Sequence, residues 1–503
     1  MSDPDTLTPL ITAAQAFPKM EEVVLGARDE VLASFRIFDA RTPLRSDAAR
    51  AAGLENWADL MARKVAEGVR VRILMADFDP VFAADLHRDA WASARALCKV
   101  LGRQEQHDAQ VLVAWHGQEV GPFWKRVLSG QVATRLSALQ QAQAPTAPQK
   151  EALGGRWTVR PVSLHQKFLV ADGEAAVIGG LDVNPRRWDD PDHQRDPEDT
   201  WHDISLHVTG RIAGDIRAHF CACWNDALNV PAQSFADTPA PMPADAPQRR
   251  STGPRLVRTL SRPAGGWLRF GPAPDIREHE QLHLAAIASA HDSIYIETQF
   301  LRHKPIARAL ARAAARAPHL QLILVLPTEP ERVIFGGDDG PDARHAQALQ
   351  IDCLDMLRQA FGARLAVVSP VQPRAADPGQ NGDPVKGAGI VYLHAKVTLV
   401  DDRFGIVGSA NLNGRSMLWD TEASVLFTDA GRIGALRQDL AAKWLRGWLQ
   451  HGDDPRSAAL WNGAARENAA RDPSAREGFV MPYPAARNRR FARRLPFLPD
   501  ALF

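Results

Sequence analysis

The sequence predicts an α/β protein of two similar lobes, each a mixed β-sheet flanked by helices, related by a pseudo-twofold axis with the active site between them. A motif at residues 165–172 recurs at residues 394–401, 394 − 165 = 229 residues further on and close to half of the 503-residue chain. Strand-like and helix-like segments follow in the same order in both halves. A Pro-rich stretch, residues 237–254, separates the halves. An internal duplication accounts for all three observations.

The expected elements of each half run in the order strand, helix, strand, motif strand, hairpin, closing strand and helix. The first strand follows a helix end, and the second is a short apolar run rich in Val, Ile and Leu. The closing strand opens on an acid and leads through a Gly-Arg-Ile turn into a helix that ends near a Trp. The equivalent segments are residues 27–39 and 290–301, 68–77 and 319–328, 164–184 and 393–413, and 203–225 and 422–444.

Each half carries one motif of the form H-x-K-x-x-x-x-D. Its members are His165, Lys167 and Asp172 in the first half, and His394, Lys396 and Asp401 in the second. Residues two apart on a strand point to the same face, so the His and Lys of each motif project together. Two matches with repeated flanking strands argue against coincidence. Each motif is therefore expected to supply one half of a single site.

The residue types suit an attack on a phosphodiester. Such a group is already negative, and Lys167 and Lys396 supply the positive charge that the reaction at phosphorus needs, without a metal or a cofactor. A neutral imidazole is a competent nucleophile, and a protonated one donates a proton to a leaving alkoxide. His165 and His394 thus divide two jobs, and their spacing leaves open which of them attacks.

The paired motifs resemble the phospholipase D superfamily, whose members carry two H-x-K-x-x-x-x-D motifs. The resemblance covers residues 20–450, and the strings VIGGLDVNPRRWDD, VGSANLNGRSMLWDTE and IYIETQFL are similar to segments of phospholipases D proper. It implies that His165 attacks to give a phosphohistidine. It also implies that His394 acts first as an acid and then as a base on the incoming water.

Each imidazole needs a carboxylate that fixes its tautomer and raises its basicity. Glu422 lies 422 − 394 = 28 residues after His394 and opens a strand, and the resemblance gives an acid at this place that role. The same offset in the first half falls on His193, inside a polar insert. Asp203 opens the equivalent strand, so we predict Asp203 as the partner of His165 and Glu422 as the partner of His394.

The other polar residues of the motif segments fall into two groups. Asp172 and Asp401 complete the catalytic motifs, and at the hairpin turns we expect them to brace the backbone rather than to touch phosphate. Four side chains beside the motifs are expected to bind phosphoryl oxygens: Asn184, Ser409, Asn411 and Asn413. The first copy has Gly180 and Asp182 where the second has Ser409 and Asn411, so Asp182 receives no such role.

The resemblance implies a phospholipase D that hydrolyses glycerophospholipids to phosphatidic acid and a free headgroup through a phosphohistidine, or passes the phosphatidyl group to a small alcohol. The alternatives are a cardiolipin synthase-like phosphatidyltransferase, a nuclease and a non-catalytic protein of the same fold. Such synthases usually carry N-terminal membrane helices, and we expect none here. Both motifs and both acids are present, which disfavours the non-catalytic alternative.

The composition bears on partners and location. The net charge is +1, so no overall field draws the protein to nucleic acid or to an anionic membrane, and we expect no nucleic-acid partner. The resemblance implies a phospholipid substrate at a membrane surface. The four cysteines show no zinc-type spacing, and we expect them to be reduced. We expect no transmembrane segment, a monomer, and a cytoplasmic or peripheral membrane location, with export by a signal-independent secretion system as an alternative.

The expected domains are an N-terminal lobe at residues 1–236, a Pro-rich linker at 237–265, a C-terminal lobe at 266–450 and a C-terminal extension at 451–503. The extension ends in a tail where arginines alternate with apolar residues. This tail either lies on anionic lipid or packs on the body of the protein.

Overall fold

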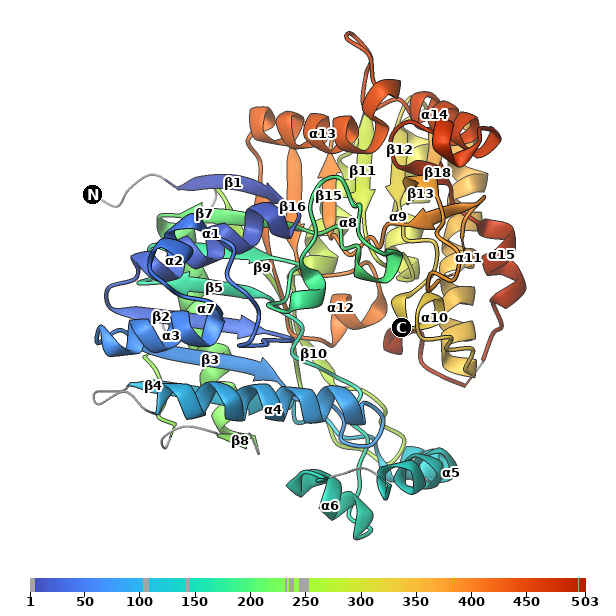
Figure 1. Ribbon diagram of the computed structural model, residues 1–503. Coiled ribbons are helices and arrows are strands. Elements are labelled where there is room, and N and C mark those ends of the chain that lie inside the picture. The colour runs from blue at the N-terminus through green and yellow to red at the C-terminus, as the bar shows by residue number, and fades with distance from the viewer. Residues whose placement is uncertain are drawn as a thin grey trace.

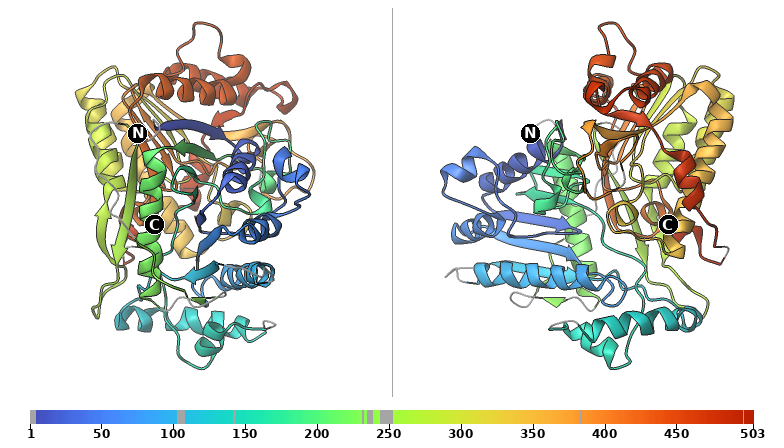
Figure 2. Two further views of the ribbon diagram at one scale, coloured as in Figure 1. Left: turned by 90° about the vertical axis from the view of Figure 1, so that its left-hand side faces the viewer. Right: turned by 45° about the vertical axis from the view of Figure 1, so that its right-hand side comes forward.

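The computed structural model describes residues 5–102, 108–141, 144–230, 233–234, 239–243, 253–382, 384–495 and 497–503. Two mixed β-sheets lie side by side, one from each half of the chain (Figures 1 and 2). Among the described residues, no helix is both long and apolar enough to span a bilayer.

The first sheet has eight strands in the order β1-β7-β6-β5-β2-β3-β4-β8. The strands are β1 (Thr6–Ile11), β2 (Glu30–Phe35), β3 (Arg70–Ala76), β4 (Ala109–Ala114), β5 (Phe168–Ala171), β6 (Ala175–Gly179), β7 (Ile204–Thr209) and β8 (Gln233–Ser234). Strands β2, β3 and β4 are parallel, and β5, β6 and β7 extend the sheet antiparallel from β2.

The second sheet has ten strands, nine in the order β10-β9-β17-β16-β15-β11-β12-β13-β14, with β18 paired to β13. The strands are β9 (Arg255–Arg262), β10 (Ala273–Arg277), β11 (Ser293–Glu297), β12 (Gln321–Val325), β13 (Leu365–Ala375), β14 (Ala388–Ile390), β15 (Val397–Val400), β16 (Phe404–Gly408), β17 (Glu422–Phe427) and β18 (Val480–Pro482). The run β17-β16-β15-β11-β12-β13 repeats the order and directions of β7-β6-β5-β2-β3-β4. The predicted two-lobed α/β fold is confirmed.

Helices cover the outer faces of both sheets, and α7 and α13 contribute apolar side chains to the core between the sheets. The helices are α1 (Ala13–Gly26), α2 (Asp47–Ala51), α3 (Trp57–Ala66), α4 (Ala84–Leu101), α5 (Pro122–Leu139), α6 (Ala147–Leu153), α7 (Arg211–Leu228), α8 (Glu278–Ala288), α9 (Lys304–Arg316), α10 (Glu331–Ile334), α11 (Pro341–Phe361), α12 (Gly414–Leu418), α13 (Ala430–Leu445), α14 (Ala458–Ala470) and α15 (Ala485–Phe491).

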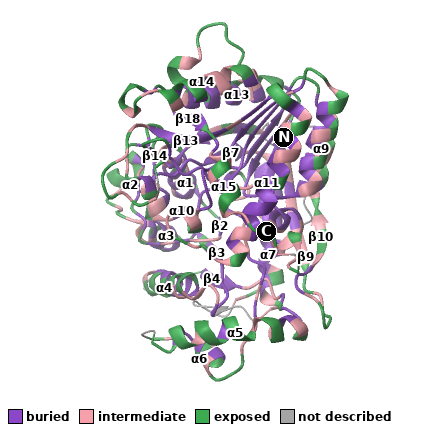
Figure 3. Ribbon diagram, turned by 90° about the vertical axis from the view of Figure 1, so that its right-hand side faces the viewer, coloured by how far each residue is buried: buried purple, intermediate pink, exposed green. Residues whose placement is uncertain are grey.

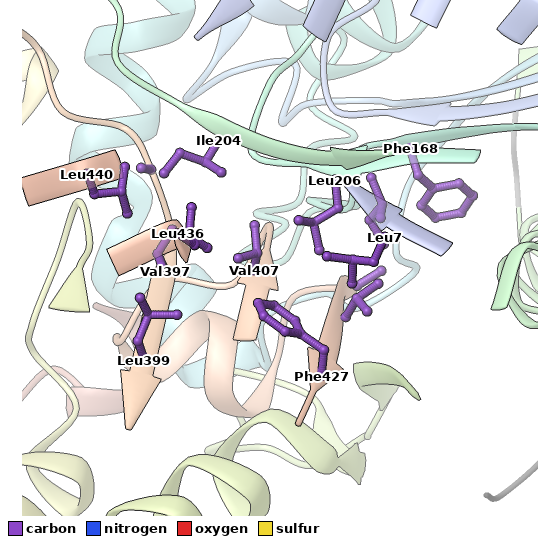
Figure 4. Packing of buried hydrophobic residues seen from close by; sticks show 14 of the residues in the cluster. Leu7, Phe168, Ile204, Leu206, Val397, Leu399, Val407, Phe427, Leu436 and Leu440 are labelled. Atoms are coloured by element: carbon purple, nitrogen blue, oxygen red, sulfur yellow. The ribbon is translucent and has the colours of Figure 1, made fainter. Parts of the chain in front are cut away.

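A large apolar core joins the two lobes. It contains Phe168 and Leu206 of the first sheet, Val397 and Val407 of the second, and apolar residues of α7 and α13 such as Leu440 (Figure 4). The central strands of both sheets, such as β2, β5, β11 and β15, are buried along their whole length (Figure 3), so burial of their apolar side chains stabilises the packing of the lobes. The strands that carry the site therefore share a buried apolar core.

Two expected boundaries differ from the structure. Residues 255–262, inside the predicted linker, form β9 and pair with β17, while residues 235–238 and 244–252 of the Pro-rich region lie outside the described residues. The C-terminal extension adds β18 to the second sheet. Its tail packs on the body, because Arg487 pairs with Glu329 and Arg489 with Asp355. The other domain limits stay predictions.

Candidate active site

The two motif histidines lie at the seam between the lobes, each just before its strand, β5 or β15. The His165 N–H donates to the carbonyl of Thr421 at 2.9 Å, and the His394 N–H donates to the carbonyl of His202 at 2.8 Å. Each motif is thus bonded to the segment that opens the closing strand of the other lobe. This exchange of backbone bonds brings the two motifs together into one site.

The supporting acids pair across the lobes. Nδ1 of His165 lies 2.9 Å from Oε1 of Glu422, and Nδ1 of His394 lies 2.6 Å from Oδ2 of Asp203. The predicted pairing, Asp203 with His165 and Glu422 with His394, is wrong. The offset argument assumed that each repeat completes its own site, whereas the docked lobes exchange their acids.

The environment keeps both imidazoles neutral. Burial lowers the pKa of His165 and of His394 well below 6.5, and the neighbouring lysines lower it further. Because each Nδ1–H donates to a carboxylate, each Nε2 keeps a free lone pair. Burial also raises the pKa of Asp203 and of Glu422 to about 7. Each pair therefore offers an unprotonated Nε2 that a carboxylate supports.

The two motif lysines lie buried beside their histidines. Nζ of Lys167 donates to the His165 carbonyl at 2.6 Å, and Nζ of Lys396 donates to the His394 carbonyl. Burial lowers the pKa of both ammonium groups, to about 7 for Lys396. A dianionic transition state would raise the pKa of both ammonium groups, because it adds negative charge nearby.

The motif aspartates are bonded to backbone. Asp172 accepts from the N–H groups of Arg28, Asp29 and Glu30 at 2.8–2.9 Å. Asp401 accepts from three consecutive N–H groups in the same way, those of His291, Asp292 and Ser293. Both aspartates have positive φ angles at their hairpin turns. They fasten each motif hairpin to the start of β2 or β11 in its own lobe.

The predicted phosphate-binding residues differ in the hydrogen bonds that they make around the site. Asn184 and Asn413 each cap a short helical turn, accepting from Arg186 and Ser416. Asn411 is buried, and its Nδ2 lies 3.4 Å from Oε1 of Gln299. Their contact with a phosphoryl group stays a prediction.

The second copy has Ser409 where the first copy has Gly180, and the contacts at these two positions explain the difference. Oγ of Ser409 donates to Oε2 of Glu422 at 2.5 Å. At Gly180 a Cβ atom would lie 2.2 Å from Oδ1 of Asp203, so only glycine leaves room for that carboxylate. Asp182 faces the backbone, where it accepts from the N–H of Ile37 at 2.8 Å.

Comparison with known proteins places this arrangement in a family. A family model described as "Cardiolipin synthase, PLD-like domain" matches residues 283–444. Phospholipase D A of Dictyostelium discoideum is 23% identical over 367 residues, 58% of this chain and 27% of the relative. Probable cardiolipin synthase YwiE of Bacillus subtilis is 25% identical over 277 residues, 54% of this chain and 44% of the relative. The matches thus span less than half the length of these relatives.

A solved structure shares the fold over most of the chain. The crystal structure of phosphatidylserine synthase from Haemophilus influenzae Rd KW20 aligns with a TM-score of 0.53 over 86% of this chain and 84% of that one, at 12% identity. The family model and the relatives support the phospholipase D superfamily as the family of this chain.

Three further residues join the site without any signal in the H-x-K-x-x-x-x-D motifs. Trp201 stacks near His394, with ring centroids 4.7 Å apart, and Cζ of Arg187 lies 3.5 Å from the Trp201 ring centre. Arg36 follows β2 beside the Asp182 segment, and its charge contributes to the low pKa of His165. Arg187 acts on His394 in the same way. These arginines place extra positive charge at both histidines.

A buried polar cluster supports the His394 side of the site. Glu297 accepts from Nε2 of His202 at 3.0 Å, from the Tyr295 hydroxyl at 2.5 Å and from Nε1 of Trp444 at 2.6 Å. His193 stacks on Trp444 from the other side of the seam. Glu297 is fully buried beneath the site.

Two Gly-rich loops line a hollow of about 790 Å³ beyond the site. Its walls include residues 336–339, Asn381 and Gly382, together with Phe335 and Phe491. Phe335 packs near Tyr392, whose ring lies 5.0 Å from that of Trp201. An unbroken row of aromatic side chains thus runs from His394 to the hollow.

Proposed function

We propose that the chain is a phospholipase D-type phosphodiesterase that hydrolyses glycerophospholipids to phosphatidic acid and a free headgroup. The observation that carries the proposal is the pair of carboxylate-bound histidines, His165 with Glu422 and His394 with Asp203, each with a buried lysine beside it. Two neutral imidazoles and two ammonium groups suffice for a double displacement at phosphorus.

In the first step, Nε2 of His165 attacks phosphorus while Lys167 and Lys396 stabilise the phosphoryl oxygens. A bond forms between phosphorus and Nε2, the bond to the headgroup oxygen breaks, and His394 gives its proton to that oxygen. The negative substrate raises the pKa of His394, so that His394 carries this proton in the complex. The products are phosphatidyl-His165 and the free headgroup alcohol.

In the second step, His394 takes a proton from a water molecule, and the water oxygen attacks phosphorus. The phosphorus–nitrogen bond breaks, which releases phosphatidic acid and returns His165 as a neutral imidazole. An alcohol in place of water would give a new phosphodiester by the same route. Hydrolysis and transfer therefore share every protein group.

The test of the proposal is release of phosphatidic acid from mixed phospholipid vesicles in EDTA. Wild type is compared with His165→Ala, His394→Ala and the exposed control His319→Ala. We expect product from wild type and from the control, and none from the two site variants. Cleavage of DNA instead of lipid, with the same dependence on both histidines, would keep the mechanism and overturn the substrate.

The roles of the two histidines are separable with a leaving group that needs no acid. A phosphatidyl ester of p-nitrophenol should give His394→Ala a burst of nitrophenolate, because His165 still attacks and the phosphohistidine accumulates. His165→Ala should give no burst. The reverse pattern would assign the attack to His394.

A phosphatidyltransferase is the second candidate, because the family model and the Bacillus relative both carry a cardiolipin synthase description. This activity uses a lipid alcohol as the acceptor. Vesicles of phosphatidylglycerol with added ethanol distinguish the candidates: phosphatidic acid and phosphatidylethanol indicate the hydrolase, and cardiolipin indicates the synthase.

We also propose that the protein works as a monomer on phospholipid at a membrane surface, since one chain supplies both motifs. Sedimentation of the pure protein checks this state.

A further inference from the structure

Large apolar side chains are exposed together at one end of the molecule. The loop that joins β9 to β10 presents Trp267 and Leu268, which are 63% and 64% exposed, and Val127 of α5 is 53% exposed. These are three of the five large apolar side chains that stand out as exposed among the described residues. Figures 1 and 2 show α5 and α6 projecting from this end, away from both sheets. We call Trp267, Leu268, Phe123 and Val127 the apolar tip.

The backbone of the apolar tip is held firmly although its side chains are exposed. The Phe123 N–H donates to the Trp267 carbonyl at 3.2 Å, and Nε1 of Trp124 donates to the Leu268 carbonyl at 2.9 Å. The Phe123 and Trp267 rings lie 5.4 Å apart. At Gly121 a Cβ atom would lie 2.3 Å from the Gly266 carbonyl oxygen, so glycine permits this close docking. The fold therefore holds the apolar side chains of Trp267 and Leu268 in contact with water, which costs free energy unless a partner covers them.

The segments around the apolar tip are basic. Residues 119–156 carry five cationic side chains and two acidic ones, 5 − 2 = +3, whereas the whole chain has a net charge of +1. The loop between β9 and β10 adds Arg269 and no acid. This combination of an interfacial Trp, a neighbouring Leu and surrounding cations matches the surface of a bilayer with anionic lipids.

Packed side chains connect the apolar tip to the active site. Trp124 packs edge-on against Phe270 at 5.0 Å, and Phe270 stacks on Trp419 at 6.4 Å. Trp419 lies two residues before Thr421, whose carbonyl accepts from the N–H of His165. The apolar tip and the first motif are therefore parts of one rigid unit.

We infer that the apolar tip docks on the surface of an anionic phospholipid bilayer and inserts Trp267 and Leu268 among the lipids, which holds the active site at the membrane. This inference rests on the proposed function, because docking on a membrane serves an enzyme whose substrate is a lipid. A protein partner fits less well, since a stable protein interface needs roughly 800 Å² on each side. Three exposed side chains on a projecting loop and helix are too few for that.

The test uses the variant Trp267→Ala/Leu268→Ala, with Leu460→Ala on α14 as a control at the opposite end of the molecule (Figure 1). Co-sedimentation with vesicles of phosphatidylcholine and phosphatidylglycerol measures binding without any need for activity. We expect the variant to bind at least about tenfold more weakly than wild type, because each buried apolar side chain contributes on the order of 1.5–3 kcal/mol. The control should bind as wild type.

Kinetics separate this inference from the proposed function. The variant should lose activity on vesicles and keep wild-type kcat/KM on a short-chain phospholipid dissolved as monomers. Unchanged vesicle binding in the variant would overturn the docking role. A changed oligomeric state with unchanged vesicle binding would assign the apolar tip to contact between copies. Failure of wild type to cleave either lipid would overturn the proposed function, while co-sedimentation would still decide the docking role.

Discussion

Glu422 in the second half of the chain lies 2.9 Å from Nδ1 of His165 in the first half. Asp203 and His394 repeat this relationship in the opposite direction at 2.6 Å. Neither lobe therefore holds a complete His-acid pair. A lobe that folded without its partner would lack the imidazole that pairs with its acid, so the site is complete only when the two lobes are docked.

The crossed pairing predicts which imidazole responds to each acid. Glu422→Gln should move the 15N chemical shifts and the pKa of His165 and leave those of His394 nearly unchanged, because the carboxylate fixes the tautomer of its own partner. Asp203→Asn should do the reverse. NMR of protein labelled with 15N-histidine measures both, with signals assigned from His165→Ala and His394→Ala. Equal responses of both histidines to one substitution would contradict the pairing.

The pKa values of the site predict a narrow pH optimum. Burial raises the pKa of Asp203 and Glu422 to about 7 and lowers that of Lys396 to about 7. The carboxylates act when ionised and the lysine when protonated, so kcat/KM should rise as the acids lose protons and fall as Lys396 loses its own. The measurement is kcat/KM on a soluble nitrophenyl diester between about pH 5 and pH 9.

The alkaline limb of this profile belongs to Lys396. In Lys396→Arg the guanidinium stays protonated, so the limb should move to higher pH even if the maximum is lower. A wild-type profile that stays flat from about pH 6 to pH 9 would show that neither group titrates in this range.

The motif aspartates should matter for stability more than for chemistry. Asp172→Asn and Asp401→Asn each remove a charged acceptor from three backbone N–H groups, and should lower the free energy of unfolding by about 2 kcal/mol. Asparagine tolerates the positive φ of both turns, so the backbone path is kept. Urea unfolding measures the loss, with the exposed Asp377→Asn as the control. A loss of kcat above about a hundredfold at unchanged stability would instead indicate a direct catalytic role.

The sequence predicted the repeated strand order and both His/Lys pairs because these depend on short-range patterns. A two-residue spacing decides which side chains share a face, and an offset of 229 residues shows the duplication. The pairing of Asp203 and Glu422 depends instead on how two lobes dock, which no spacing within one copy encodes. No sequence pattern pointed to Arg36 or Trp201. Arg36 follows a strand and Trp201 precedes one, and neither lies within a motif.

Glu297 illustrates a buried acid that the sequence left open. Its position in the apolar run IYIE fits either a site residue or a strand end, and the structure gives it three donors from two lobes. Burial alone would raise its pKa, but His202 and the other donors hold the pKa below 4.5. Its contribution to stability is therefore present above about pH 4.5 and is lost as the pH falls through the lowered pKa.

Glu297→Gln should lower the free energy of unfolding at pH 7 by about 2–4 kcal/mol, because the amide nitrogen faces at least one donor and leaves it unsatisfied. The difference from wild type should shrink as the pH falls through the lowered pKa of Glu297, because the carboxyl group of wild type then becomes protonated as well. Urea unfolding at several pH values measures both effects. A difference that is constant with pH would show that ionisation of Glu297 does not stabilise the fold.

Arg36 should contribute to catalysis through its charge. Its guanidinium lies 5.0 Å from the Phe78 ring centre, and no hydrogen bond or ion pair ties it to another described residue. Burial and the nearby Arg415 and Arg187 lower its pKa, while Asp182 raises it. A cation kept in such surroundings is costly to the fold. It is well placed to stabilise negative charge that develops on the phosphoryl oxygens beside His165.

Arg36→Gln should therefore lower kcat/KM by roughly tenfold to a hundredfold and leave the melting temperature equal or higher, because a costly buried charge is removed. The pKa of His165 should rise in the same variant, since Arg36 lowers it in wild type. Arg312→Gln, an exposed arginine on α9, is the matched control and should change neither quantity. If Arg36→Gln lowers stability and leaves kcat/KM unchanged, the guanidinium serves packing on Phe78 and not the reaction.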